Sequence, residues 1–137
     1  REKREERGRE EGGMGFKFER FEAWKRAIVF ADEMFVLADA LPQRYQFSLG
    51  EQLRRAALSI PTNLAEGAGR DNVNEEGYFY RIAKGSVYEV LSLLVMFQRR
   101  GHLSEVLYRR HYQEADEIAA MISGAIRSKK RPPSIRS

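Results

Sequence analysis

Cysteine is absent from the 137 residues of the chain. Its absence excludes disulfide bonds, thiolate metal ligands, a cysteine nucleophile and thiol redox chemistry. Long hydrophobic runs are also missing, because no apolar stretch approaches the roughly 20 residues that a membrane helix requires. The first residues are charged and include no apolar segment of the kind found in secretory signals. We therefore expect a soluble, cytoplasmic protein without a membrane partner.

Side chains suited to catalysis or metal binding are scarce. The two histidines, His102 and His111, are nine residues apart, which is not a metal-ligand spacing on one helix. The Glu-x-x-His pairs of di-iron bundles do not occur. Residues 67–69 read Gly-Ala-Gly, but they follow a helical pattern and lack the Lys-Ser/Thr pair of a phosphate loop. We predict that the protein is not an enzyme and has no metal or other cofactor.

The net charge of +4 is unevenly placed. Residues 1–13 hold equal numbers of acidic and basic side chains, and residues 14–126 hold 14 basic and 15 acidic ones. Residues 127–137 hold five basic side chains and no acidic one. We expect a charged leader (1–17), one bundle domain (18–127) and a basic tail (128–137). The tail is either a phosphate-binding segment or only a solubilising end.

Four segments carry apolar residues at alternating spacings of three and four, which is typical of amphipathic helices. We expect helices over about 20–40, 48–69, 75–100 and 104–127. The apolar seams are Phe21, Trp24, Ile28, Ala31, Phe35 and Ala38; Leu49, Leu53, Ala56, Ile60, Leu64 and Gly67; Phe79, Ile82, Ser86, Val90, Leu93 and Phe97; and Tyr108, Tyr112, Ala115, Ala119, Ile122 and Ile126. Short connections make successive helices antiparallel neighbours. The predicted fold class is all-α, an up-down-up-down antiparallel four-helix bundle.

Residues suited to helix ends support these limits. Ser48, Asn74 and Ser104 are predicted N-caps, the first with Glu51 as its capping-box partner. Gly101 suits the position just after the third helix, where a left-handed backbone is favoured.

Pro61 interrupts the second predicted helix. It removes one backbone donor, so we predict a kink near Ala57. Ser59 and Asn63 bracket the proline, and both can bond the carbonyl groups that it frees.

Arginines gather at one end of the predicted bundle. Arg99, Arg100, Arg109 and Arg110 flank the last connection, which shares an end with Arg44. We predict a nucleic-acid interface there, with His102 and His111 adding to it. The tail would extend it through Arg127, Lys129, Lys130 and Arg131. A solvated end, in which Glu105 and Glu114 pair with the arginines, is the alternative.

Residues 50–70, GEQLRRAALSIPTNLAEGAGR, resemble the signature of a four-helix-bundle family encoded in intervening sequences of bacterial 23S ribosomal RNA genes. The matching residues are Gln52, Leu53, Arg54, Arg55, Ala56, Ser59, Ile60, Pro61, Asn63, Ala65, Glu66, Gly67, Gly69 and Arg70, followed downstream by Ala83, Gly85, Ser86 and Glu89. The resemblance covers about residues 18–126. It defines a structural motif of Arg54, Arg55, Ser59, Pro61, Asn63, Glu66, Arg70 and Glu89.

The resemblance implies a small homo-oligomer, usually a pentameric ring. It also implies kinship to the accessory variability determinant of diversity-generating retroelements, which binds nucleic acid and a reverse transcriptase. We therefore predict a non-enzymatic, oligomeric protein that associates with nucleic acid, either structured RNA or DNA, and is accessory to a reverse transcriptase. The alternative is an oligomeric scaffold without a nucleic-acid ligand, which the near-neutral body of the chain favours.

Large apolar residues outside the four seams also predict an oligomer. Tyr78, Tyr80, Leu91, Val95 and Leu107 would leave an exposed apolar patch on a monomeric bundle.

The acidic residues of the motif are predicted to form ion pairs rather than to act as paired catalytic carboxylates. Glu89 is expected to pair with Arg54 or Arg55, and Glu66 with a nearby arginine. Arg54 and Arg55 point about 100° apart on a helix, so they cannot both serve one site.

Overall fold

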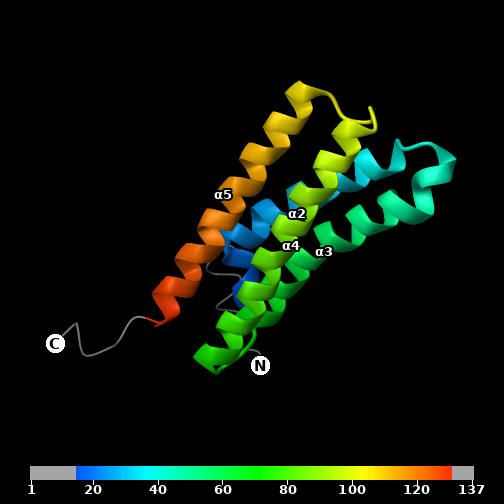
Figure 1. The fold of residues 1–137 in the computed structure, drawn as a ribbon. Coiled ribbons are helices and arrows are strands. Elements are labelled where there is room, and N and C mark those ends of the chain that lie inside the picture. Colours follow the sequence, from blue (N-terminus) through cyan, green and yellow to red (C-terminus); the bar gives the residue numbers. More distant parts are fainter. Residues whose placement is uncertain (1–14, 131–137) are drawn as a thin grey trace.

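The computed structural model describes residues 15–130 and consists of four long helices (Figure 1). These are α2 (Glu22–Asp39), α3 (Glu51–Ala68), α4 (Val73–Arg99) and α5 (Glu105–Lys130). The 3-10 helix η1 (Lys17–Arg20) precedes α2, while η2 (Gln43–Tyr45) and the π-helical turn η3 (Gln46–Gly50) join α2 to α3. Successive helices run in opposite directions. The predicted all-α four-helix bundle is confirmed.

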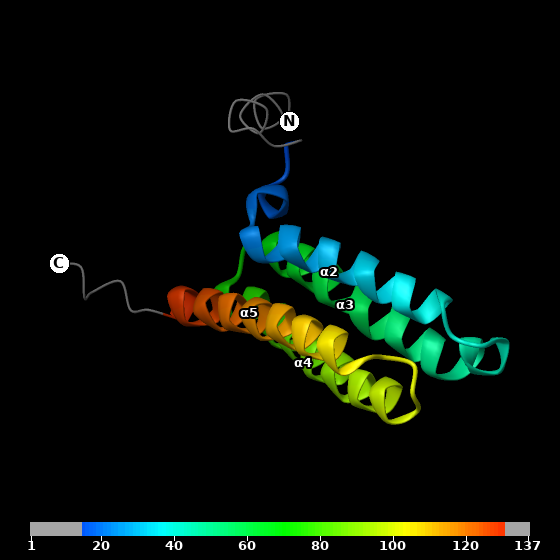
Figure 2. The ribbon, with the colours of Figure 1, turned by 90° about the horizontal axis from the view of Figure 1, so that it is seen from above.

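The helices form two layers, α2 with α3 and α4 with α5 (Figure 2). Contacts between α2 and α5 close the ring, and these two pack least closely of the four adjacent pairs. The α2–α3 and α4–α5 connections lie at the same end of the bundle (Figure 1). None of the helices between residues 15 and 130 is long and apolar enough to cross a membrane.

The buried face of each helix matches the predicted seam to a different degree. In α3 the predicted residues from Leu53 to Gly67 are buried. In α2 the buried side chains include Phe30 and Met34, whereas Ile28 is exposed. In α5 the predicted seam residue Tyr112 is exposed, and the adjacent His111 is buried in its place. The predicted seam and the observed buried face differ where two adjacent residues both suit the core. Helical spacing alone does not decide which of the two is buried.

Two of the three predicted N-caps are wrong. Asn72 rather than Asn74 caps α4, because its side chain accepts hydrogen bonds from the backbone N–H groups of Asn74 (2.7 Å) and Glu75 (3.2 Å). Ser48 lies inside η3 and caps no helix, since its hydroxyl donates weakly to the carbonyl of Tyr45. Ser104 is confirmed as a cap, and its hydroxyl accepts a bond from the N–H of Leu107 at 3.2 Å.

Gly101 ends α4 as predicted. Its φ of +82° lies in the left-handed region that favours glycine. The N–H of His102 bonds the carbonyl of Phe97 (2.8 Å), and the N–H of Gly101 bonds that of Gln98 (3.0 Å). This is the Schellman arrangement, which turns the chain sharply toward α5.

Pro61 lies within α3, which continues through it to Ala68. Asn63 donates to the carbonyl of Ser59 at 2.8 Å, so the prediction that it bonds a carbonyl freed by the proline is wrong. The carbonyl that Pro61 frees is that of Ala57, because a proline has no N–H to bond it. Asn63 bonds the carbonyl of Ser59 instead. The kink stays a prediction.

Candidate nucleic-acid interface

Tyr45 is the centre of a cluster of cations at the end of the bundle. The guanidinium carbon of Arg44 lies 5.0 Å from the centre of the Tyr45 ring, and that of Arg100 lies 5.8 Å from it. The His102 ring meets the same tyrosine edge-on, with ring centres 5.4 Å apart. The predicted convergence of the two connections is therefore confirmed for Arg44 and Arg100.

Local backbone structure brings these side chains together. Arg44 and Tyr45 lie in η2, the short helix that follows Pro42. Arg100 and His102 flank Gly101, whose left-handed backbone folds the end of α4 back toward η2.

The electrostatics of the cluster favour negative charge. A hydrogen bond from Arg44 and the positive charges of Arg100 and Arg44 lower the pKa of the Tyr45 hydroxyl. Neither arginine forms an ion pair with an acidic side chain among residues 15–130. Phe47, in the same connection, is 82% exposed. The arrangement offers guanidinium groups for phosphate and an uncovered aromatic face for a base.

The four predicted arginines differ in their partners. Arg99 and Arg100 are exposed and have no acidic partner in the described part of the chain. Arg109 Nε lies 2.9 Å from Glu105 Oε1, and Arg110 Nη2 lies 3.5 Å from Glu33 Oε2. Arg109 and Arg110 therefore follow the alternative interpretation, a bundle end in which ion pairs occupy the arginines.

Arg127, the first of the predicted basic residues near the tail, does not join this cluster. Arg127 is exposed near the C-terminal end of α5, at the opposite end of the bundle (Figure 1). There it lines an open groove of about 420 Å³ between α4 and α5, together with Arg81 and Lys84. The α5 backbone stays helical through Lys129 and Lys130, three residues beyond the predicted limit. Arg131 lies outside the described residues, as does most of the predicted leader.

The predicted ion pair of Glu89 is wrong. Glu89 is exposed on α4 and has no ion-pair partner among the described residues. Arg54 instead contacts Asp39 Oδ1 at 2.6 Å, and Arg55 lies 3.8 Å from Glu51. Adjacent antiparallel helices can bring the two motif segments together, but Glu89, like its neighbour Tyr88, is exposed on α4.

Glu66 forms its predicted ion pair, and its partner is Arg70 one turn later in the chain. Arg70 also lies 3.9 Å from Glu75 and 4.8 Å from the centre of the Phe79 ring. The motif residues Glu66 and Arg70 thus hold together the α3–α4 connection.

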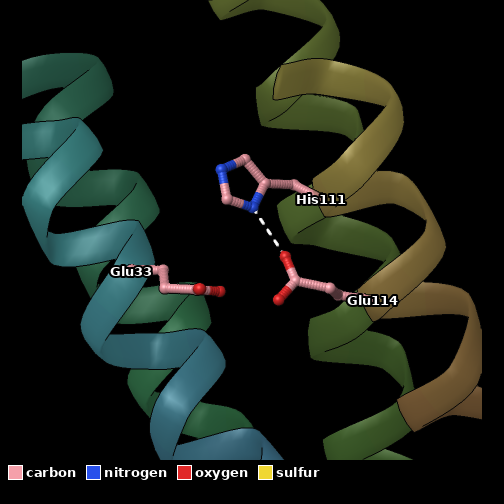
Figure 3. A group of neighbouring side chains, drawn as sticks. All are labelled: Glu33, His111 and Glu114. Carbon is pink, nitrogen blue, oxygen red and sulfur yellow. Dashed lines mark hydrogen bonds and ion pairs between the residues drawn. The ribbon is translucent and has the colours of Figure 1, made fainter. Parts of the chain in front are cut away.

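A different group of side chains, between α2 and α5, has the composition of a metal site. It consists of Glu33, His111 and Glu114 (Figure 3). The prediction that His111 belongs to the arginine-rich end is wrong, because its ring is buried against Phe30. The sequence signal is His-x-x-Glu at 111–114, the reverse of the Glu-x-x-His pattern sought above.

The fold defines the class of the protein as an all-α antiparallel four-helix bundle. The family described as 23S rRNA-intervening sequence protein matches residues 19–124, so the chain belongs to this family. No curated protein matches the chain.

Proposed function

We propose that the protein is a non-enzymatic, oligomeric nucleic-acid-binding protein. Its binding surface is the arginine end, by which we mean Arg44, Tyr45, Phe47, Arg99 and Arg100. The observation that carries the proposal is the approach of two guanidinium groups, those of Arg44 and Arg100, to the ring of Tyr45. The family description, which names a 23S rRNA intervening sequence, makes RNA the first ligand to test.

The chemistry of the arginine end suits unpaired nucleotides. A guanidinium group binds phosphate oxygens in a bidentate manner and stays charged at any physiological pH. An exposed aromatic ring such as that of Phe47 stacks on a base, which contributes about 1–3 kcal/mol per base and tolerates any sequence. Residues 14–126 have nearly balanced charge, so affinity would depend on this local cluster rather than on the field of the whole protein.

Exposed apolar side chains support an oligomer. Val36 on α2, Leu58 on α3 and Val106 on α5 are each at least half exposed. Surfaces of this kind are covered when subunits associate. The family resemblance favours a five-membered ring, which would repeat the arginine end about five times and add avidity to weak contacts.

Fluorescence anisotropy with a labelled single-stranded RNA tests the proposal. The full chain should bind, and its affinity should fall steeply as salt rises. The double variant Arg99→Gln/Arg100→Gln should bind more weakly. Its salt slope should be shallower by about 0.7 for each phosphate group that the variant no longer neutralises.

The matched control is Arg81→Gln/Arg127→Gln, which removes the same charge at the opposite end of the bundle. It should retain the parent slope. An equal loss in both variants would show that binding follows net charge and would refute the arginine end as the interface. Absence of binding at low salt would leave the oligomeric scaffold as the function.

A further inference from the structure

We propose that Glu33, His111 and Glu114 bind one divalent transition-metal ion, of the Zn²⁺ type, that joins α2 to α5. The site lies between α2 and α5, and the proposal is independent of the nucleic-acid function proposed above.

Three potential ligands from two helices meet at this site. His111 and Glu114 are three residues apart on α5 and therefore share one helix face. Glu33 reaches across from α2 toward them (Figure 3). One ligand atom from each residue lies within 4.8 Å of the others, and His111 Nδ1 is 2.8 Å from Glu114 Oε1. Ligands about 2.0–2.2 Å from a tetrahedral ion are roughly 3–3.5 Å apart, so a small side-chain rotation completes the site.

Burial leaves one carboxylate oxygen of the group without a hydrogen-bond donor among the described residues. This oxygen is Glu33 Oε1, and the neighbouring His111 is only 5% exposed. Arg110 Nη2 lies 3.5 Å from the other Glu33 oxygen, Oε2, and His111 Nδ1 is the partner of Glu114.

A divalent cation supplies what the group lacks. It can take the place of the proton shared by His111 Nδ1 and Glu114, and it also provides a partner for the bare Glu33 oxygen. Imidazole nitrogen selects Zn²⁺ and related ions over Mg²⁺ and Ca²⁺, while carboxylates are acceptable ligands to Zn²⁺. Three protein ligands leave a position for water, which reaches Glu114 from a groove of about 260 Å³ between α2 and α5.

The location gives such an ion a structural consequence. Because α2 and α5 pack least closely among the adjacent helices, the ion would join the pair of helices with the fewest contacts to hold it together. An ion that binds only the folded state stabilises it by mass action. At Zn²⁺ concentrations of about 100 times Kd, we expect the melting temperature to rise by roughly 5–10 °C.

The test uses the full chain without a histidine tag, stripped of metal by a chelator and dialysed free of it. Isothermal titration calorimetry with Zn²⁺ should give one ion per chain, and melting curves should shift upward. Mg²⁺ should do neither. The background is low, because the chain has no cysteine and His102 is the one other histidine.

Isosteric variants connect binding to these residues. Glu33→Gln and Glu114→Gln should each weaken Zn²⁺ binding by at least about tenfold and abolish the shift in melting temperature. His102→Gln and Glu117→Gln are the controls, and both should bind Zn²⁺ as the parent does. Glu117 pairs with Arg26 on the same two helices. If Zn²⁺ does not bind, or binds equally to Glu33→Gln and Glu114→Gln, the proposal is wrong. If the variant His111→Gln does not fold, Glu33→Gln and Glu114→Gln still test the proposal.

Discussion

The Ser59 hydroxyl of α3 and the Ser86 hydroxyl of α4 lie 2.7 Å apart and share a hydrogen bond across the helix interface. Asn63 donates to the same Ser59 oxygen at 3.0 Å, and the carbonyl oxygen of Ile82 lies 3.2 Å from the Ser86 hydroxyl as its alternative acceptor. The two serines are 27 residues apart, and each lies in one of the two segments that carry the family resemblance. Serine is small enough to let α3 and α4 approach closely while its polar group stays satisfied.

Replacing Ser59 or Ser86 by alanine should therefore lower the free energy of unfolding by about 0.5–1.5 kcal/mol in each case. The double variant should lose less than the sum, because the first substitution already removes the shared bond. Urea unfolding of the four proteins in this cycle measures the coupling. Strictly additive losses would mean that the two hydroxyls do not interact.

Gly67 on α3 packs tightly against α4. A Cβ at this position would lie 2.7 Å from Tyr80 Cε1 and 3.0 Å from the carbonyl oxygen of Glu76. Gly67→Ala should reduce stability by about 1–3 kcal/mol, because the buried ring and the neighbouring backbone must move.

Gly85 provides the matched control on α4. It is exposed, and a Cβ there meets no atom within 4 Å. Gly85→Ala should raise stability by about 0.4–1 kcal/mol, since alanine restricts the unfolded chain and favours the helix. The two substitutions should have opposite signs in one denaturation series. A loss at Gly85 would show that its surface is covered, as in an oligomer interface.

Tyr80 and Glu76 form a buried pair whose hydroxyl and carboxylate oxygens lie 2.7 Å apart. Tyr80→Phe should cost about 1.5–3 kcal/mol of stability, the usual worth of a hydrogen bond to a charged group. The measurement is the free energy of unfolding at pH 8, where the ordinary tyrosine hydroxyl is protonated.

The same pair predicts a pH dependence. Burial, followed by the hydrogen bond and the charge of Glu76, raises the pKa of Tyr80 above its ordinary value. Above about pH 10 the unfolded tyrosine loses its proton while the folded one keeps it, so unfolding becomes more favourable as pH rises. The stability advantage of the parent over Tyr80→Phe should shrink between pH 9 and 11. A constant difference over that range would contradict the raised pKa.

Local patterns in the sequence predicted most of the fold. The apolar seams predicted the four helices, and the caps at Gly101 and Ser104 were correct because each depends on residues within one turn. The connection at 43–50 was not predicted, because Ser48 and Glu51 match a capping box although the chain there forms η2 and η3. The contact of Tyr45 with Arg100 and the bond from the Gln46 side chain to the carbonyl of Leu41 hold this region, and neither follows from helical spacing.

Side-chain partners at a distance were harder to predict than helices. Arg109 and Arg110 fit a binding surface by composition, yet Arg110 meets Glu33, which is 77 residues away. The proposed metal site has the same origin, since Glu33 joins His111 and Glu114 only after α2 packs beside α5. Spacing within one helix predicts a shared face, but not which residue the neighbouring helix supplies.

The central claim is that nucleic acid contacts the arginine end. Ultraviolet crosslinking of a single-stranded RNA to the full chain, followed by trypsin and mass spectrometry, tests it most directly. Trypsin cleavage after Arg44 and Arg54 releases one peptide that contains both Tyr45 and Phe47. Our account predicts that the crosslinked nucleotide is found on this peptide. Crosslinks confined to other aromatic residues, such as Tyr88 or Tyr112, would contradict it.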